Sequence, residues 1–277
     1  MVGVGLRSNH YPYLESKPKT NVDWFEAISE NYINTEGRPL EILLKVREQY
    51  PIALHGVSLS IGSAEKPSVE YLQKLKKLIE RVDPVIVSDH LCWTRTPTHN
   101  SHDLLPIPFT EESLKTVSRN IDFVQNYLGR SLLLENISYY FKYKESLIDE
   151  TEFMVELART TGCQFLIDLN NIYVNSVNHG FNPMAFFDRI PIDLIGQIHL
   201  AGPTQEDGYL FDTHSGFVPD EVWKLFSHAL LKGLKAPILI EWDQDIPEFS
   251  VLEQEVLKAK KIIQEGMHVG KYFDASL

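Results

Sequence analysis

The hydrophobic positions of this chain form short β-type runs, and helix-type patterns fall between most of them. Eight β-type runs occur, at residues 2–6, 24–28, 52–57, 85–91, 132–136, 165–169, 194–200 and 238–242. Apolar residues three and four positions apart predict helices at residues 41–50, 69–82, 111–128, 150–161, 183–190, 219–231 and 248–265. Strands that alternate with helices predict an α/β fold, here a (β/α)8 TIM barrel formed as a single domain by residues 1–277.

Local signals support several of these boundaries. Thr110 and Ser113, followed by early acids, are typical of a helix start, and Gly129 is typical of a helix end. Residues 92–110 are predicted to be a long loop. A doubly wound sheet is the alternative fold, but no glycine-rich dinucleotide loop supports it.

Six of the apolar runs end in residue types that bind metals. The residues are His55, His90 (after Asp89), Glu135, Asp168, His199 and Glu241. In a barrel of this kind the C-terminal ends of the strands meet at one mouth, so these side chains should converge there. A buried carboxylate needs a cationic, hydrogen-bonding or metal partner, and Glu135 is placed to bridge two ions.

Two further segments can reach the same mouth. Asp212 and His214 have the spacing that points both side chains one way in an extended segment, and Asn171 follows Asp168 by three residues. Imidazole and carboxylate ligands suit several metals, and nine candidates exceed the needs of a single ion. The sequence therefore predicts a multinuclear metal site.

Each candidate also has a purely structural interpretation. A single strand-end histidine such as His55 is often only hydrogen-bonded, and Glu135 could pair with Arg130 or Lys142. Asp212 and His214 could form a surface turn. Six coincident strand ends make a separate structural explanation for each residue improbable.

Other polar and aromatic residues are weaker candidates. His99 and His102 are predicted to be solvated or to contact substrate, and Cys92 to be a buried, inert thiol. Four histidines are expected to be structural: His10, His179, His228 and His268. Four aromatic residues are expected either to line a substrate groove or to pack at the rim: Trp93, Tyr139, Tyr140 and Trp242.

Composition and charge argue against several classes of binding partner. A net charge of −12 argues against non-specific binding to nucleic acid or to anionic membranes. Two cysteines make no disulfide framework, and no apolar run is long enough to span a membrane. A cytoplasmic location is expected.

The motifs together resemble the multinuclear non-haem iron-dependent oxidases, the family of the methanobactin-synthesis oxidase. The resemblance extends over nearly the whole chain. The matching segments are the stretch His55-Gly-Val-Ser and the motifs Ser88-Asp-His90, Leu134-Glu135-Asn136, Asp168-Leu-Asn-Asn171, His199-Leu-Ala-Gly, Asp212-x-His214 and Glu241-Trp-Asp. They are also similar, in order and roles, to the trinuclear-zinc apurinic endonucleases and to the sugar isomerases, which implies a xylose-isomerase-like barrel.

The resemblance implies three metal sites. His55, His90 and Glu135 would hold the first ion, while Glu135, Asp168, His199 and Glu241 would hold the second. The third would lie between Asn171, Asp212 and His214. The endonucleases have a histidine where this chain has Asn171, and asparagine is the weaker ligand. Glu135, Asp212 and His214 are the residues expected to act in catalysis.

The implied activity is a dioxygen-dependent oxidation of cysteine residues in a ribosomally made peptide. It implies two or three iron ions (Fe2+/Fe3+), with zinc or manganese as alternatives, and a partner protein that recognises the peptide leader. Two other functions stay open at this point: a di- or trinuclear phosphodiesterase related to the apurinic endonucleases, and a metal-storage or peptide-binding scaffold.

Overall fold

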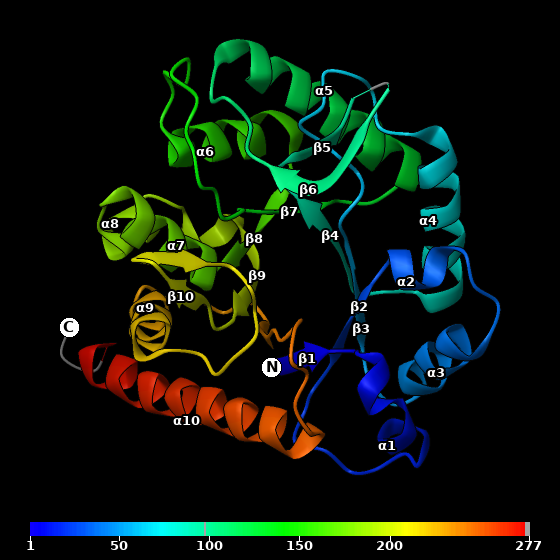
Figure 1. Cartoon of the computed structure of the whole chain (residues 1–277). Helices are drawn as coiled ribbons and strands as arrows, with labels where there is room; N and C mark the ends of the chain where they lie inside the picture. The colour runs from blue at the N-terminus through cyan, green and yellow to red at the C-terminus, as the bar shows by residue number, and fades with distance from the viewer. Residues whose placement is uncertain (97, 275–277) are drawn as a thin grey trace.

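The computed structural model describes residues 1–96 and 98–274. Eight parallel strands close into a barrel in the order β1-β12-β9-β8-β7-β4-β3-β2, and Figure 1 shows helices around it. The strands are β1 (Val2–Gly5), β2 (Phe25–Ile28), β3 (Ile52–Gly56), β4 (Ile86–His90), β7 (Leu133–Glu135), β8 (Gln164–Asp168), β9 (Ile195–Leu200) and β12 (Ile238–Ile240). The predicted TIM barrel is confirmed, and the observed strands fall within a residue or two of the predicted ones.

Helices follow most strands and cover the outside of the barrel. They are η1 (Ser8–His10), α1 (Tyr11–Glu15), α2 (Glu30–Ile33), α3 (Arg38–Arg47), α4 (Val69–Val82), α5 (Glu111–Leu128), α6 (Glu150–Thr161), α7 (Leu169–His179), α8 (Pro183–Phe187), η2 (Ile192–Leu194), α9 (Asp220–Leu231) and α10 (Phe249–Asp274). The Thr110 side chain accepts a hydrogen bond from Ser113 N (3.1 Å), and Gly129 ends α5 with a φ of 70°. Both predicted signals therefore cap this helix.

The interior of the barrel divides into an apolar floor and a polar mouth. Trp24, Ala53 and Leu239 form a small cluster of their own, apart from the main core, with Ile86 packed against it. A side chain at Gly3 would meet the Trp24 ring, because its Cβ would lie 2.5 Å from that ring. Alternate residues of a strand face the same way. A residue two or four positions after each of these apolar residues therefore points into the same interior, but closer to the mouth of the barrel.

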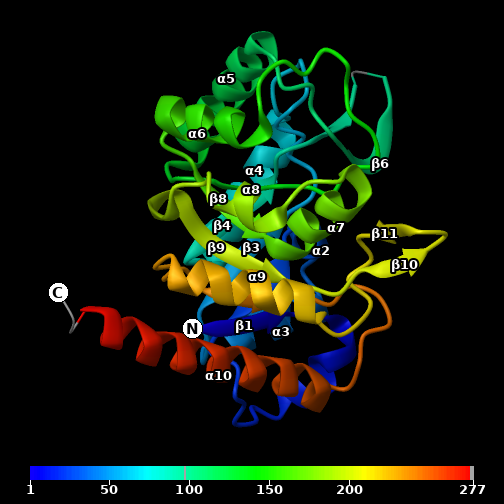
Figure 2. The same cartoon turned by 90° about the vertical axis from the view of Figure 1, so that its left-hand side faces the viewer.

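Two hairpins on the mouth side differ from the predictions. Residues 92–110 are not one long loop, because β5 (Trp93–Arg95) pairs antiparallel with β6 (Asn100–Leu105). After β9 a second hairpin pairs β10 (Thr204–Glu206) with β11 (Tyr209–Phe211). Figure 2 shows both hairpins on the same side of the molecule. Short hairpin strands that are mostly polar lack the apolar run by which a buried strand is detected.

The structure also adds helices that were not expected, and α7 is the longest of those in the described residues. α7 starts directly at the end of β8, and the Asp168 side chain caps it by accepting a hydrogen bond from Asn171 N (2.8 Å). The helix carries polar residues along most of its length, which weakens the helical pattern in the sequence. Among the described residues, no helix is both long and apolar enough to cross a membrane.

Candidate metal centre

Six strands bring the predicted strand-end residues to the mouth of the barrel. His90 is the register partner of Glu135, and Asp168 is the register partner of His199. Glu241 directly follows β12, and all six side chains are buried, with at most 8% of any residue exposed. The strand-end residues named in the sequence analysis are His55, His90, Glu135, Asp168, His199 and Glu241, and the structure brings all of them together.

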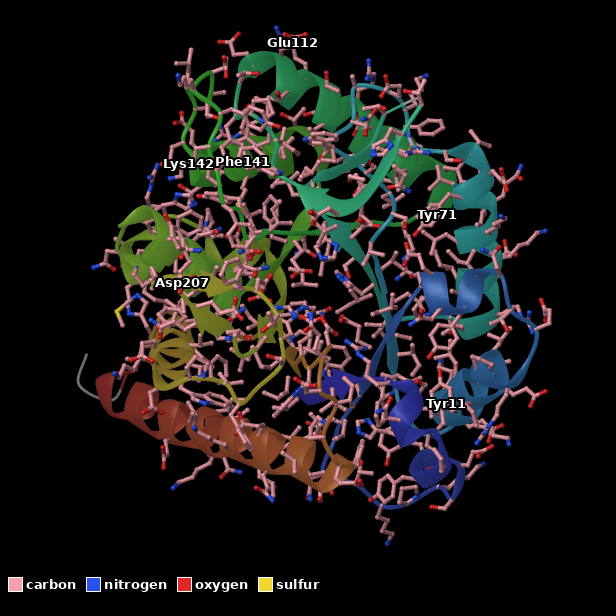
Figure 3. The ribbon with its side chains drawn as sticks, in the orientation of Figure 1. Tyr11, Tyr71, Glu112, Phe141, Lys142 and Asp207 are labelled. Atoms are coloured by element: carbon pink, nitrogen blue, oxygen red, sulfur yellow. The ribbon has the colours of Figure 1, made fainter. Side chains whose placement is uncertain are left out.

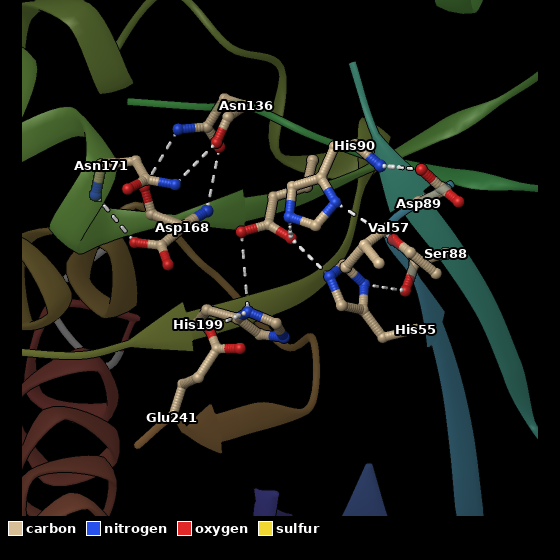
Figure 4. Close-up of polar contacts among 12 residues, drawn as sticks. His55, Val57, Ser88, Asp89, His90, Asn136, Asp168, Asn171, His199 and Glu241 are labelled. Atoms are coloured by element: carbon tan, nitrogen blue, oxygen red, sulfur yellow. Dashed lines mark hydrogen bonds and ion pairs between the residues drawn. The ribbon is translucent and has the colours of Figure 1, made fainter. Parts of the chain in front are cut away.

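Figure 4 shows His55 and His90 on one side of the centre and His199 and Glu241 on the other. Glu135 lies between these two sets of candidate ligands. Its Oε2 atom is 3.2 Å from His55 Nε2 and 3.4 Å from His90 Nε2. Its other oxygen, Oε1, is 3.7 Å from His199 Nδ1. A carboxylate with each oxygen directed at a different set of nitrogens has the geometry of a bridge between two ions.

The histidines are held by their outer nitrogens. Nδ1 of His90 lies 3.0 Å from the Gly56 carbonyl, which can only accept, so this nitrogen carries the proton of the neutral ring. Nδ1 of His55 lies 2.8 Å from Ser88 Oγ. In His90, Nε2 therefore faces Glu135 with its lone pair, and Nε2 of His55 faces the same carboxylate. A second partner on the outer nitrogen is the usual arrangement for histidines that bind metals.

His199 is turned the other way. Its Nδ1 atom lies 2.8 Å from Glu241 Oε2 and its Nε2 atom lies 3.2 Å from Glu26 Oε1. Glu26 is 2% exposed and also accepts a hydrogen bond from Gln197 Nε2 (2.5 Å). Sequence analysis missed Glu26, although a carboxylate inside the apolar run 24–28 was a signal that could have found it.

His214 lies between two pairs of acids. Its Nε2 atom is 2.6 Å from Asp212 Oδ1 and 3.7 Å from Asp168 Oδ2. Its Nδ1 atom is 3.0 Å from Asp243 Oδ2 and 3.4 Å from Glu241 Oε2. The residue has a φ of 47°, a left-handed conformation that is uncommon for a side chain other than glycine and often marks a functional position.

Three groups in the described part of the chain could hold a metal ion. They are His55 with His90 and Glu135; Glu135 with Asp168, His199 and Glu241; and His214 with Glu241 and Asp243. The first two have the same members as the first two sets implied by the resemblance. The third differs, because Glu241 and Asp243 accompany His214 in place of Asn171 and Asp212, and the predicted third set stays a prediction.

Orphaned polar atoms show that the centre suits cations. Six buried atoms of the predicted ligands make no hydrogen bond of acceptable geometry with the described residues. They are Glu135 Oε2, Asp168 Oδ2, Asn171 Oδ1, His199 Nδ1, His214 Nε2 and Glu241 Oε2. Native structures rarely leave such atoms unsatisfied. Metal ions would satisfy them, and the donor set of imidazoles, carboxylates and an amide is one that metals bind.

Buried acids shape the electrostatics of the centre. Burial raises the pKa of Glu135 well above its ordinary value, with Glu241 and Asp168 adding to the shift. Burial likewise raises the pKa of Asp168 to about 7, against an opposing effect of His214. Burial lowers the pKa of His90 to about 4. Burial alone would also lower the pKa of His199, but Glu241, Glu26 and Glu135 outweigh it and raise that pKa well above 6.5.

Arg7 is the cation nearest to this cluster of acids. Its guanidinium donates a short hydrogen bond to Asp243 and lies 3.9 Å from Glu241. Burial opposes ionisation of Asp243, but His214 and Arg7 hold its pKa far below the usual range. Asp212 is held by hydrogen bonds from Ser138 Oγ (3.0 Å) and Asn170 Nδ2 (2.7 Å). The sequence analysis assigned no role to Arg7, Asp243 or Asn170.

The centre opens into a cavity of about 340 Å3. Of the nine predicted ligands, the cavity is lined by His55, His90, Glu135, Asn171, Asp212, His214 and Glu241. Asp168 and His199 lie behind these residues with no exposed surface. Tyr139 and Tyr140, for which groove lining and rim packing were both left open, line the cavity, and so do Asp103 and Leu104 of the β5–β6 hairpin. This cavity is the space in which a substrate can meet the centre.

The remaining aromatic and cysteine candidates do not line this cavity. Trp93 donates to the Pro106 carbonyl (2.9 Å), and Trp242 packs edge-to-face on Phe217. Cys92 is buried and free, and burial raises its pKa well above 9.0.

The remaining histidine candidates with described side chains belong to none of the three groups. His99 is exposed in the β5–β6 hairpin, while the side chains of His102 and His268 lie outside the described part of the chain. The other three have local partners: His10 with Pro247 O, His179 with Tyr139 O and His228 with Asp188 Oδ1.

Fold and site together define a (β/α)8 enzyme whose mouth can hold metal ions. The chain belongs to the RiPP precursor modification enzyme MbnB/TglH/ChrH family, whose sequence profile matches residues 1–264. RiPPs are ribosomally made peptides that enzymes modify after synthesis. The chain is 46% identical to a UPF0276 protein of Acaryochloris marina over 257 residues, which is 93% of this chain and 92% of the relative. It is 47% identical to a UPF0276 protein of Anaeromyxobacter sp. over 261 residues, 94% and 92% of the two chains.

Solved structures share the fold at low sequence identity. An L-ribulose 3-epimerase matches with a TM-score of 0.64 at 13% identity and covers 99% of this chain and 97% of its own. Endonuclease IV from Thermus thermophilus matches with a TM-score of 0.61 at 14% identity and covers 96% and 98%. These likenesses show the barrel alone and say nothing about which reaction this chain performs.

Proposed function

We propose that this protein is a multinuclear iron-dependent oxidase that uses dioxygen to modify cysteine residues of a ribosomally made peptide. The family supports a peptide substrate. The observation that carries the proposal is the pair of buried groups that share Glu135. In these groups Glu135 Oε2, Asp168 Oδ2, His199 Nδ1 and Glu241 Oε2 make no hydrogen bond of acceptable geometry with the described residues. Oxygen and imidazole ligands suit iron, and no cysteine belongs to the groups found among the described residues.

The residues divide into holding and orienting roles. His55, His90 and Glu135 would hold one ion, and Glu135 with Asp168, His199 and Glu241 would hold the next. Bound iron supplies one-electron oxidation of a thiolate and reduction of dioxygen. Ser88 and the Gly56 carbonyl fix the rings of His55 and His90, while Glu26 fixes the ring of His199. These partners set the direction of each lone pair before a substrate arrives.

Asp212 and His214 are assigned to proton handling. Both line the cavity, and Asp212 Oδ1 lies 2.6 Å from His214 Nε2. Burial lowers the pKa of His214, but Asp212 and Glu241 outweigh it and raise that pKa well above 6.5, so the ring is protonated. With two ions held by the first two groups, the Asp212 carboxylate is the member of the pair that can accept the proton a cysteine thiol loses when it becomes a thiolate. Asn170 and Ser138 keep the Asp212 carboxylate in place for that transfer.

A partner protein that recognises the peptide leader forms part of the proposal. Large apolar side chains are exposed around the mouth, including Tyr140, Phe141, Tyr209 and Phe211. Tyr140 stacks on Phe211 with their ring centroids 5.4 Å apart, which joins the β7 loop to the second hairpin. Exposed aromatic clusters are typical of interaction surfaces.

Metal content tests the proposal first. Protein purified without oxygen from iron-supplemented cells should carry two or three irons per chain, with Mössbauer signals of coupled ferric and ferrous ions. It should also consume dioxygen when a cysteine-containing peptide is added. The variant Glu255→Gln is a control and should keep the metal content of wild type. Glu255 is a buried acid that accepts a hydrogen bond from Val218 N (3.0 Å) and belongs to none of the three groups. Stoichiometric zinc together with nicking of abasic DNA would instead favour the phosphodiesterase.

A further inference from the structure

A second cavity lies beside the metal cavity and has no role in the chemistry described so far. It measures about 440 Å3, within the range of roughly 300–1,000 Å3 that is usual for small-molecule sites. The loop after β7, the start of α6 and helix α8 form its walls. Six aromatic rings line it: Phe109, Tyr139, Phe141, Tyr143, Phe181 and Phe186.

The two cavities are neighbours. Pro106, Tyr139 and Phe141 line both of them. Figure 3 shows Phe141 and Lys142 side by side, and both belong to the loop between β7 and α6. Tyr139 is held in this shared wall by stacking on His179, with ring centroids 4.8 Å apart, and by its hydroxyl bond to Glu150. A peptide whose cysteine lies in the metal cavity can therefore extend a nearby side chain into the second one.

The charges that line the second cavity balance. Asp149 pairs with Arg189 at 2.8 Å. Lys142 Nζ lies 5.5 Å from the centroid of the Tyr139 ring and 5.9 Å from that of Phe181. Glu150 is the second acid, so two acids face two bases. An ionic occupant would find no net opposite charge, whereas a neutral ring would find several ring faces and edges to pack against.

One polar group can recognise the edge or tip of such a ring. The Glu150 carboxylate accepts a hydrogen bond from the Tyr139 hydroxyl (3.0 Å), its one hydrogen bond among the described residues. A carboxylate can accept several hydrogen bonds. It therefore retains capacity for a phenol O–H or an indole N–H of an occupant.

We propose that this second cavity binds an aromatic side chain of the peptide substrate, tyrosine or tryptophan, close in sequence to the reacting cysteine. The inference rests on the proposed function for its peptide, but not on iron or on turnover. The cavity would then select among the cysteines of a precursor by their aromatic neighbours.

Direct binding of a small probe tests this inference. N-acetyl-L-tyrosinamide, which has no thiol, should bind the full-length protein saturably in a saturation-transfer NMR titration. Ala185 lines the cavity from α8, and Ala185→Trp should fill it and raise the dissociation constant at least tenfold. Met184→Trp is the matched control, because Met184 is exposed on the same helix and does not line this cavity. That variant should bind within twofold of wild type.

Several results would overturn the inference. They are an absence of saturable binding by wild type, an unchanged dissociation constant in Ala185→Trp, or an equal loss in Met184→Trp. Tighter binding of N-acetyl-L-lysinamide than of the tyrosine probe would refute the aromatic class. If circular dichroism shows that Ala185→Trp does not fold, Phe181→Ala carries the same expectation, since it removes a ring of the wall. Because the probe needs neither metal nor oxygen, a failed oxidase assay and a failed binding assay remain distinguishable.

Discussion

Replacing Asp168 by asparagine should stabilise the metal-free protein at neutral pH, although the same change should weaken metal binding. Asp168 has no exposed surface, and its Oδ2 atom has no hydrogen-bond partner among the described residues. Its Oδ1 atom caps α7 by accepting from Asn171 N. Asparagine caps a helix as well as aspartate does, so Asp168→Asn keeps the cap and removes only the buried charge.

The magnitude follows from the pKa of Asp168. Burial raises it from 3.8 to about 7 in the folded protein. Between those values the folded state binds more protons than the unfolded state, so the free energy of unfolding falls as the pH rises. The full difference corresponds to about 4 kcal/mol at about 1.4 kcal/mol per pKa unit, and acids that share protons with Asp168 reduce it. The low pKa of His90 acts in the opposite direction between about 4 and 6.5, so only the comparison with a variant isolates Asp168.

Urea unfolding with a chelator present, at pH 4 and at pH 7.5, measures this contribution. Asp168→Asn and wild type should be nearly equal at pH 4, and the variant should be more stable at pH 7.5 by up to about 4 kcal/mol. Added metal should reverse the order, because only wild type has the full ligand set. Asp149→Asn is the control: Asp149 caps α6 in the same way, but Thr151 and Arg189 outweigh its burial and lower its pKa. A difference between Asp168→Asn and wild type that does not grow with pH would refute the reasoning.

Three further predictions concern the metal ions and use metal analysis of purified variants. Glu135→Ala should lose more than one equivalent of metal, because a bridge serves two ions; a loss of one or none would contradict the bridging geometry. Asp212→Ala should cost only a third ion if the predicted third set is correct, whereas loss of that ion from Asp243→Asn alone would favour the set that contains Asp243. Glu26→Gln should weaken metal binding by roughly 10–100-fold by releasing the ring of His199, and unchanged affinity in a chelator competition would show that Glu26 has no orienting role.

Much of the centre was predictable because a barrel converts sequence position into spatial position. An apolar run that ends in His or a carboxylate places that residue at the C-terminal end of a strand, and every such end reaches the same mouth. His55, Glu135 and Glu241 are far apart in the chain but follow this one rule. The strand period of two adds that Ala53 and Leu239 face the barrel floor when His55 and Glu241 face its mouth.

Other features needed long-range contacts that local patterns do not contain. The β5–β6 hairpin is short and mostly polar, so its strands were not detected in residues 92–110. Glu26 was passed over because its partner, His199, is more than 170 residues away. Asp243 joins the site through Arg7 and His214, and neither contact follows from its own neighbours in the sequence.

The sequence alone determined the barrel, the strand-end histidines and carboxylates and their gathering at the mouth, because strand periodicity and chain order suffice for these. Only the tertiary structure decided which acids lie against each nitrogen of His214 and which nitrogen of each histidine faces inward. It also decided which aromatic residues enclose the second cavity. Those features depend on side chains from separate segments meeting at distances of a few ångströms, and local patterning carries no information about such meetings.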